Sequence, residues 1–314
     1  MIVYLLRRLA LTIPTLLLVA VSVFVLIRLI PGDPAQMMLG DAAGVEEVAA
    51  LRRQMGLDQP IPLQFVYWLG RALTGDLGRS ITNGLSVGPL ILDRFAVTAV
   101  IVLVAVGLAA LIAVPLGMFA AWRQNRLSDV VVVAFATMML SIPSFWLGLI
   151  LLLVFGLWLK WVPVIGYVPF AEDPWRAAQF IVLPIVTLVL IEIGVLTRMA
   201  RAATIDVLRL EYIAHARAKG LSEFVVLAKH ALPNAFAPTL TLIGVVLGHL
   251  LGGIAVIETV FTLPGLGRLL VDSIYARDYP VVQGVMLFTA FIYVIINLLV
   301  DLAYPLFDPR VTAE

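Results

Sequence analysis

The chain has 314 residues, of which 62% are apolar and 13% are charged, and its mean hydropathy is +1.07. Because soluble domains hold roughly 45–50% apolar and 25% charged residues, this composition excludes a soluble fold. The formal net charge of +1 provides no basic surface for nucleic acid, and a sequence without cysteine excludes disulfides, thiolate nucleophiles and cysteine-ligated metals. The composition predicts a membrane protein that binds no nucleic acid.

Six apolar segments are long enough to cross a membrane as helices. A helix that crosses about 30 Å of hydrocarbon needs about 20 mostly apolar residues, because its backbone groups can pair only with one another. The third segment is counted once, although Pro143 and Gly148 interrupt it. We therefore predict a single all-α, polytopic membrane domain over 1–314 with six transmembrane helices, at 9–27, 95–121, 130–159, 177–197, 235–257 and 280–300.

The first span follows Arg7 and Arg8, and we expect it to be an uncleaved anchor, because its apolar run is long and no small-x-small cleavage site precedes Pro31. Lysine and arginine are enriched in cytoplasmic loops. If both termini are cytoplasmic, the two short outer loops hold only Lys160, Arg176, Arg268 and Arg277. The inner segments then hold Arg7, Arg8, Arg123, Arg126, Arg198, Arg201, Arg209, Arg217, Lys219, Lys229 and Arg310. Both termini are thus expected in the cytoplasm.

Residues 31–94 form a large periplasmic loop in this topology. The loop begins with Pro31-Gly32-Asp33-Pro34, and it contains a predicted helix over 45–55, ended by Gly56, and another over 63–73. Its acidic and basic side chains nearly cancel, so docking of a partner by simple charge attraction is not implied. Two roles stay open for this loop: a cap on the helix bundle, or a docking platform and gate for an external binding protein.

Residues 199–233 form a large inner loop that is helical but too polar to cross a membrane. A helix from Glu211 is followed by Gly220, which suits a left-handed turn, and by a second helix that Ser222 can cap. The second helix is expected to end at Leu232-Pro233, where the next span begins. Tyr212 and Phe224 are predicted to protrude as anchors for a partner; the alternative is an ordinary basic inner loop.

This inner loop resembles the cytoplasmic coupling loop of binding-protein-dependent ABC importer permeases. The family pattern is Glu-Ala-Ala, three residues, Gly, nine residues, Ile, one residue, Leu-Pro. Set on Gly220, it places its second Ala on Ala216 and its Leu-Pro on Leu232 and Pro233, whereas Ala214, His215 and His230 depart from the usual Glu, Ala and Ile. The form Ala-Arg-Ala-Lys-Gly is similar to the variant found in dipeptide, oligopeptide and nickel permeases.

The resemblance to that subfamily extends over nearly the whole chain, and it is closest to the first of the two permease subunits of dipeptide importers. The shared stretches include Gly56-Leu57-Asp58, Gly75-Asp76-Leu77-Gly78-Arg79-Ser80, Phe261-Thr262-Leu263-Pro264-Gly265-Leu266-Gly267, Arg277-Asp278-Tyr279-Pro280-Val281-Val282-Gln283-Gly284 and Asn297-Leu298-Leu299-Val300-Asp301-Leu302. Each stretch alone is a weak signal, whereas their shared order is a strong one.

The resemblance implies a type I ABC importer permease fold in the bacterial inner membrane. It also implies a heterodimer with a homologous second permease, two cytoplasmic ATPase subunits and an extracytoplasmic substrate-binding protein. The residues expected to couple this chain to the ATPases are Glu211, Tyr212, Ala214, His215, Ala216, Arg217, Gly220, Phe224, Leu232 and Pro233.

The chain is not expected to be an enzyme or to hold a cofactor. A phosphate loop needs Gly-Lys-Ser/Thr, and Lys160, Lys219 and Lys229 follow Leu, Ala and Ala. ATP and Mg are therefore assigned to the partner ATPases. The alternative function, a stand-alone ion-coupled secondary transporter, is disfavoured because the midplane segments lack acids.

Ionisable groups near lipid are candidates for the pathway or for helix pairing. Arg28, Glu258 and Asp301 stand at span ends, where we expect them to reach the headgroups. Glu192 is left open between a cavity and a pairing role, and His249 is expected to form a hydrogen bond in helix packing. The glycines 244, 248, 252 and 253 predict close helix packing, within this subunit rather than across a dimer.

Overall fold

The computed structural model describes residues 2–29, 34–39, 43–54 and 56–303, so the Pro31-Gly32-Asp33 stretch of the sequence analysis lies outside the described residues. The described part is helical, and its one β-type contact is an isolated bridge between Arg79 and Ser86. The expected all-α fold is confirmed. The elements are α1 (Ile2–Leu29), α2 (Pro34–Leu39), α3 (Val45–Gln54), α4 (Ile61–Leu73), α5 (Val87–Trp122), α6 (Leu127–Ser141), α7 (Ser144–Leu151), η1 (Leu152–Trp158), α8 (Pro174–Leu208), α9 (Glu211–Ala218), α10 (Glu223–Val225), η2 (Val226–Ala231), α11 (Leu232–Gly253), α12 (Ala255–Val260), α13 (Leu266–Tyr275) and α14 (Tyr279–Ala303).

Five helical stretches in the described part are long and apolar enough to cross a membrane, and the sixth predicted span is a bent pair. In that pair α6 and the α7–η1 helix meet at 96°. The bend falls at Ile142 and Pro143, where the backbone of Ile142 is extended. A residue before proline avoids the helical region, and proline itself donates no hydrogen bond, so the helix ends there.

Glycines let the central helices approach closely. A Cβ atom on Gly117 of α5 would lie 2.6 Å from the carbonyl oxygen of Thr197 in α8, and one on Gly194 would lie 2.6 Å from the carbonyl oxygen of Ala136 in α6. Along α11, Gly244 faces Val300, Gly248 faces Tyr293 and Gly252 faces Thr289, all on α14. The prediction that this stripe packs within the subunit is confirmed for these three glycines.

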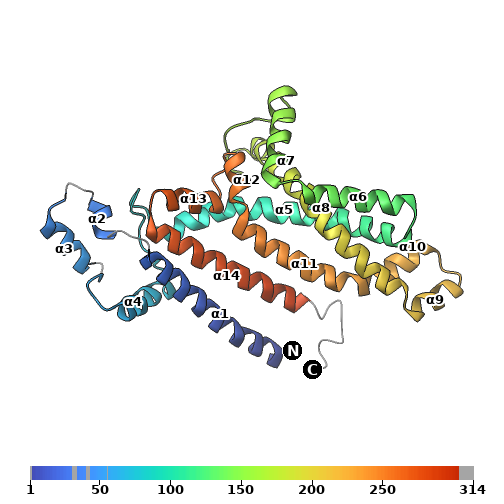
Figure 1. Ribbon diagram of the computed structural model, residues 1–314, viewed down its shortest axis with the longest axis horizontal. Coiled ribbons are helices and arrows are strands. Elements are labelled where there is room, and N and C mark those ends of the chain that lie inside the picture. The colour runs from blue at the N-terminus through green and yellow to red at the C-terminus, as the bar shows by residue number, and fades with distance from the viewer. Residues whose placement is uncertain (1, 30–33, 40–42, 55, 304–314) are drawn as a thin grey trace.

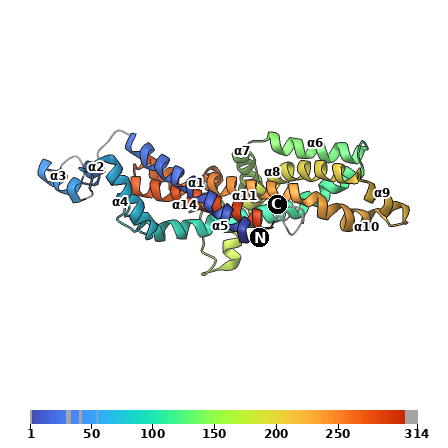
Figure 2. The same cartoon turned by 90° about the horizontal axis from the view of Figure 1, so that it is seen from below.

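The molecule is elongated, with different structures at its two ends (Figure 1). We call one end, with α4, α13 and the turn over 76–86, the α13 end, and the opposite end, with α9 and α10, the α9 end. Both views show α9 and α10 far from α2, α3 and α4, with the long helices running between them (Figure 2).

At the α13 end, α4 lies against the end of α1. The rings of Phe65 and Trp68 lie 5.3 and 5.7 Å from the ring of Phe24, and Arg28 donates a hydrogen bond to Gln64 Oε1 at 2.7 Å. α4 thus covers the end of α1 and supplies an amide acceptor for Arg28, whose guanidinium also lies 4.8 Å from the centroid of the Phe24 ring; its expected contact with the headgroups stays a prediction.

Candidate functional site

Residues 211–225, which we call the α9 segment, form a helix (α9), a tight turn and the start of a second helix (α10), as predicted. α9 ends at Ala218, and the N–H of Gly220 donates to the carbonyl oxygen of Arg217 at 2.9 Å. Gly220 has φ +80°, which confirms the left-handed turn, because residues with a Cβ rarely adopt that conformation. Ser222 stands at the N-cap position of α10, but its side chain makes no capping hydrogen bond.

A small hydrophobic core holds this segment on the long helices. Ile213 and Ala216 of α9 are buried against Val226, Ala231 and other apolar side chains of α8, η2 and α11. Ile213 is 0% exposed and was missed by the sequence analysis, although its spacing of three from Ala216 puts both residues on one helical face. The segment is therefore packed on α8 and α11 and is not a loose loop.

The two predicted anchors differ in exposure. Phe224 is 79% exposed, so it protrudes as predicted, whereas Tyr212 is 38% exposed and its hydroxyl is used within the chain. That hydroxyl donates to the carbonyl oxygen of His230 at 3.2 Å and accepts from Asn234 Nδ2 at 2.9 Å. Tyr212 thus braces α9 against the start of α11.

Charged and small side chains complete the surface of this segment. Arg217 pairs with Glu223 across the turn, with two N–H···O hydrogen bonds of 2.9 and 3.1 Å. Glu211, Ala214, His215 and Pro233 are exposed, and Leu232 is half-buried. The turn therefore offers an exposed ring, that of Phe224, next to a neutralised ion pair.

The second helix does not end at Leu232-Pro233, which corrects the sequence analysis. α10, η2 and α11 follow one another without a break, and the continuous apolar helix runs over Glu223–Gly252. Pro233 lies in the first turn of α11, directly after the π-helical turn η2, so the hydrogen bond it lacks does not interrupt the helix. At 1.5 Å per residue, this helix of 30 residues is about 45 Å long. We call it the coupling rod.

A largely buried ion pair joins α6 to α8, with Arg201 two turns before the end of α8. Arg201 of α8 donates to Asp129 of α6 at 2.6 and 2.7 Å, and the N–H of Asn125 donates to the same carboxylate at 2.9 Å. The Asp129 side chain is 4% exposed and that of Arg201 is 25% exposed. This pair ties the start of α6 to α8, and the sequence analysis treated Arg201 only as a loop cation.

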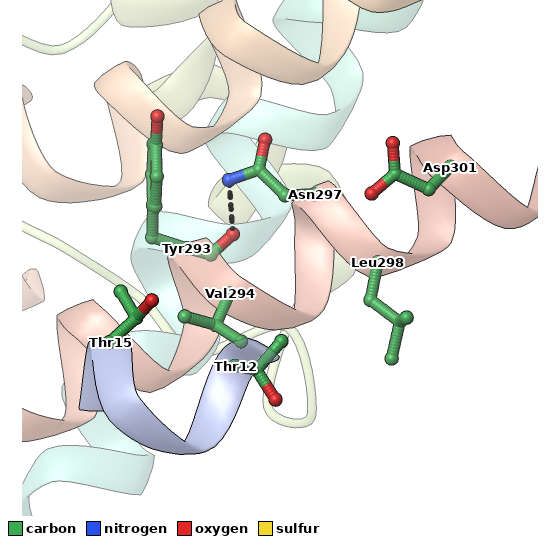
Figure 3. A pocket seen from close by; sticks show the side chains of 7 residues that line it. All are labelled: Thr12, Thr15, Tyr293, Val294, Asn297, Leu298 and Asp301. Carbon is green, nitrogen blue, oxygen red and sulfur yellow. Dashed lines mark hydrogen bonds between the residues drawn. The ribbon is translucent and has the colours of Figure 1, made fainter. Parts of the chain in front are cut away.

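The candidate pathway residues do not gather into one site. Glu192 is buried on α8 and makes no hydrogen bond within the described part, whereas His249 is exposed on α11 and likewise makes none there. Among the residues that the structure describes, His249 therefore makes none of the packing hydrogen bonds expected of it. Asp301 lines a cavity of about 210 Å³ between α1 and α14, together with Thr12, Thr15 and Asn297 (Figure 3).

The expectation that Glu258 reaches the headgroups is wrong, because its side chain is buried inside the protein. It is 0% exposed, and it accepts a hydrogen bond from the hydroxyl of Thr98 at 2.5 Å and one from the N–H of Arg268 at 2.8 Å. The helices α5, α12 and α13 close around the carboxylate and supply its donors. The sequence analysis missed Thr98.

A second buried carboxylate holds the turn before α5. Asp278 accepts hydrogen bonds from the hydroxyls of Ser80 and Thr82 and from the N–H groups of Ile81 and Thr82. These donors come from one shared sequence stretch, Gly75–Ser80, and the residues after it, whereas Asp278 belongs to another. The two stretches therefore meet in space.

A third carboxylate, that of Asp76, lies in the turn that follows α4. The N–H of Gly78 and the Arg71 guanidinium hold the pKa of Asp76 below its usual range.

The fold and the α9 segment define the class as a helical membrane protein with a polar helical segment packed on the ends of its spans. The chain belongs to the family of binding-protein-dependent transport system inner membrane components: that family matches residues 113–313, and its N-terminal companion family matches residues 1–102. The chain is a permease subunit of an ABC importer and a multi-pass inner-membrane protein. As such it works together with other components of an ABC system.

Full-length relatives share this assignment. The chain is 43% identical over 306 residues to a "Putative peptide transport system permease protein" of Brucella suis biovar 1, with 98% of each chain covered. It is 41% identical over 308 residues to the glutathione transport system permease protein GsiC of Salmonella typhimurium, again with 98% of each covered. These relatives support the importer permease over the stand-alone secondary transporter.

A solved structure confirms the fold. The chain resembles the structure described as inward-facing conformations of the MetNI methionine ABC transporter, with a TM-score of 0.53 and 21% identity. The match covers 71% of this chain and 95% of the other. The predicted type I importer permease fold is confirmed on this ground.

Proposed function

We propose that this chain and a homologous second permease together form an alternating-access pathway for di- and oligopeptides or related small solutes. Two cytoplasmic ATPase subunits bind ATP and Mg and hydrolyse the ATP, and this chain holds no cofactor. An extracytoplasmic binding protein delivers the substrate. The names of the relatives support this substrate class, because both peptides and glutathione are small amide-linked solutes.

In this proposal the α9 end is cytoplasmic, both termini are cytoplasmic and the 31–94 loop is periplasmic. The distribution of lysine and arginine supports this orientation, because the inner segments carry eleven of them and the two short outer loops carry four. The ATPases then meet the α9 segment.

The observation that carries the proposal is the mechanical continuity of the α9 segment with the membrane helices. The segment is packed on α8 through Ile213, braced by Tyr212, and continued without a break by the coupling rod. A displacement of this segment is therefore transmitted directly to two membrane helices, since close-packed helices have little freedom to slide.

Energetics assign the contact with the ATPase mainly to Phe224. Moving a two-state equilibrium from 1:99 to 99:1 requires about 5.5 kcal/mol, whereas an exposed ion pair contributes about 0–1 kcal/mol. The Arg217–Glu223 pair is thus too weak to drive the change. A buried aromatic anchor contributes about 2–4 kcal/mol on truncation, and Phe224 presents such a ring.

Substitution of the turn tests the proposal. Gly220→Pro removes a left-handed residue and an N–H donor, and Gly56→Pro is a matched control, because Gly56 has φ +67°, open space around it and an N–H bonded to Arg53. In the assembled transporter in liposomes, we expect Gly220→Pro to abolish ATP-driven uptake and Gly56→Pro to retain it. Insertion of both variants should be normal. Uptake by Gly220→Pro at the parental rate would contradict the proposal.

A further inference from the structure

The first turn of α13 is capped by side chains of two other helices. The N–H of Leu266 donates to Thr98 Oγ1 at 2.8 Å, and the N–H of Arg268 donates to Glu258 Oε2 at 2.8 Å. The hydroxyl of Thr98 in turn donates to Glu258 Oε1 at 2.5 Å. These bonds satisfy N–H groups that a helix start leaves unpaired. We call this meeting point of α5, α12 and α13 the Glu258–Thr98 joint.

The Glu258–Thr98 joint is closely packed and fully buried. A Cβ on Gly265 would overlap the Glu258 carboxylate, and a Cβ on Gly267 would lie 2.7 Å from the backbone of Ala255. Thr98 and Glu258 are both 0% exposed. Because a buried carboxylate without its donors is strongly unfavourable, α13 cannot leave this position while α12 and α5 stay in place.

The other end of α13 is held as well. Asp278 follows α13 and is 1% exposed, and its carboxylate collects its hydrogen bonds from Ser80, Ile81 and Thr82 in the turn before α5. A carboxylate with this many donors fixes the junction of α13 and α14 on that turn. α13 is thus attached at both ends to the same body of helices.

The joint lies at the far end of the coupling rod from the α9 segment (Figure 1). The rod starts at α10, and α12, which carries Glu258, begins at Ala255 directly beyond the rod. A movement received at Phe224 therefore reaches α13 through the rod, the turn at Ile254, the short helix α12 and the buried carboxylate of Glu258.

We propose that Glu258 and Thr98 are positioning residues for transport: they hold α13 on α5 and on α12, which follows the coupling rod, so that these three elements move as one body when the α9 segment moves. This inference rests on the proposed function, because it assumes that the α9 segment is the part that the ATPases move. The joint acts by holding α5, α12 and α13 together and not by a contact with substrate.

Matched substitutions test the joint. Thr98→Val removes the hydroxyl at nearly constant shape, Thr98→Ser restores it, and Glu258→Gln keeps the volume but replaces an acceptor oxygen with an amide. Thr259→Val is the control, because Thr259 is exposed and its hydroxyl donates only to the carbonyl oxygen of Ala255. Each variant is assembled with its partners in liposomes.

Two quantities are measured: hydrogen exchange of the amides at the start of α13, and solute taken up per ATP hydrolysed. In Thr98→Val and Glu258→Gln we expect exchange at Leu266–Arg268 to rise about 10- to 100-fold, the effect of losing a hydrogen bond to a charged group. Uptake per ATP should fall about 5-fold or more, while ATP hydrolysis continues. Thr98→Ser and Thr259→Val should behave like the parent.

The outcomes separate a coupling role from a merely structural one. Faster exchange with unchanged uptake per ATP, or unchanged exchange in Thr98→Val, would overturn the inference. If Glu258→Gln fails to assemble, the Val and Ser pair at position 98 still decides. If the parental assembly itself shows no ATP-driven uptake, the proposed function is wrong. The exchange measurement does not depend on uptake, so equal exchange in Thr98→Val and in the parent would still contradict the joint.

Discussion

The carboxylate of Asp129 is nearly buried and receives both N–H groups of the Arg201 fork. We expect Asp129→Asn to lower the free energy of unfolding by about 2–4 kcal/mol, because it leaves the guanidinium without its counter-charge. Denaturant unfolding in detergent micelles measures this loss. Asp206→Asn is the control: Asp206 is exposed on α8, the helix of Arg201, so its effect should stay within about 0.5 kcal/mol. Equal effects of the two variants would contradict this account.

Asp76 gives a pH-dependent prediction. The N–H of Gly78 and the side chain of Arg71 stabilise its charged form, at 3.0 and 2.9 Å, and hold its pKa below the usual range. A lowered pKa in the folded state stabilises the fold above the unfolded pKa, and the gain is lost as pH falls through the folded pKa. We expect the turn over 71–78 to be ordered at neutral pH and to loosen below about pH 4.

A nitroxide on Leu73→Cys, an exposed position in a chain without cysteine, reports this loosening as faster motion in electron paramagnetic resonance spectra. In Asp76→Asn the label should move fast at every pH. A pH titration of the label that is the same in both proteins would show that another group controls the turn.

Residue roles were predictable where the signal is local. The left-handed conformation of Gly220 follows from its position after a helix, and so does that of Gly56. Glu258 was misplaced because the sequence shows its position at a span end but not its contact with Thr98, which lies 160 residues earlier. The contact between Asp278 and Ser80, which lie 198 residues apart, was likewise not predictable.

At the scale of elements, apolar length predicted the spans because hydrocarbon leaves backbone groups no other partner. It did not predict how far helices continue beyond the membrane. α5 starts at Val87 and α8 extends to Leu208, because their ends pack on neighbouring elements rather than on lipid. Pro143 predicted an interruption of the third span. The 96° angle between α6 and the α7–η1 helix was not predicted, because it depends on contacts of α7 with α8 and α12.

The contact of α5 with α8 gives a prediction about glycine spacing. Gly117→Ala places a methyl group 2.6 Å from the carbonyl oxygen of Thr197, and the facing atoms are mostly backbone, so the helices must separate. We expect a loss of about 1–3 kcal/mol in the free energy of unfolding. Gly107→Ala on the same helix meets nothing within 4 Å and should be neutral or slightly stabilising. Similar losses in both variants would argue against close packing as the cause.

At the scale of the whole molecule, the two ends differ in construction. The α13 end is fixed by hydrogen bonds to two buried carboxylates, Glu258 and Asp278, whereas the α9 end is fixed by a small apolar core and exposes Phe224. A rigid far end and an accessible near end suit a subunit that receives a push at one side of the membrane and delivers a movement at the other. The sequence predicted the accessible end, because its turn is local, and missed the rigid one.

The proposed orientation makes the two ends distinguishable in cells. Phe224 and Tyr275 are 79% and 85% exposed and lie at opposite ends, and the chain has no cysteine that would add background labelling. Because basic residues are retained in the cytoplasm, we expect a membrane-impermeant maleimide to label Tyr275→Cys from outside in spheroplasts, and to label Phe224→Cys only in inverted vesicles made without the ATPase subunits. Each variant serves as the other's control for reagent access. The opposite pattern would place the α9 segment outside, where no ATPase could reach it.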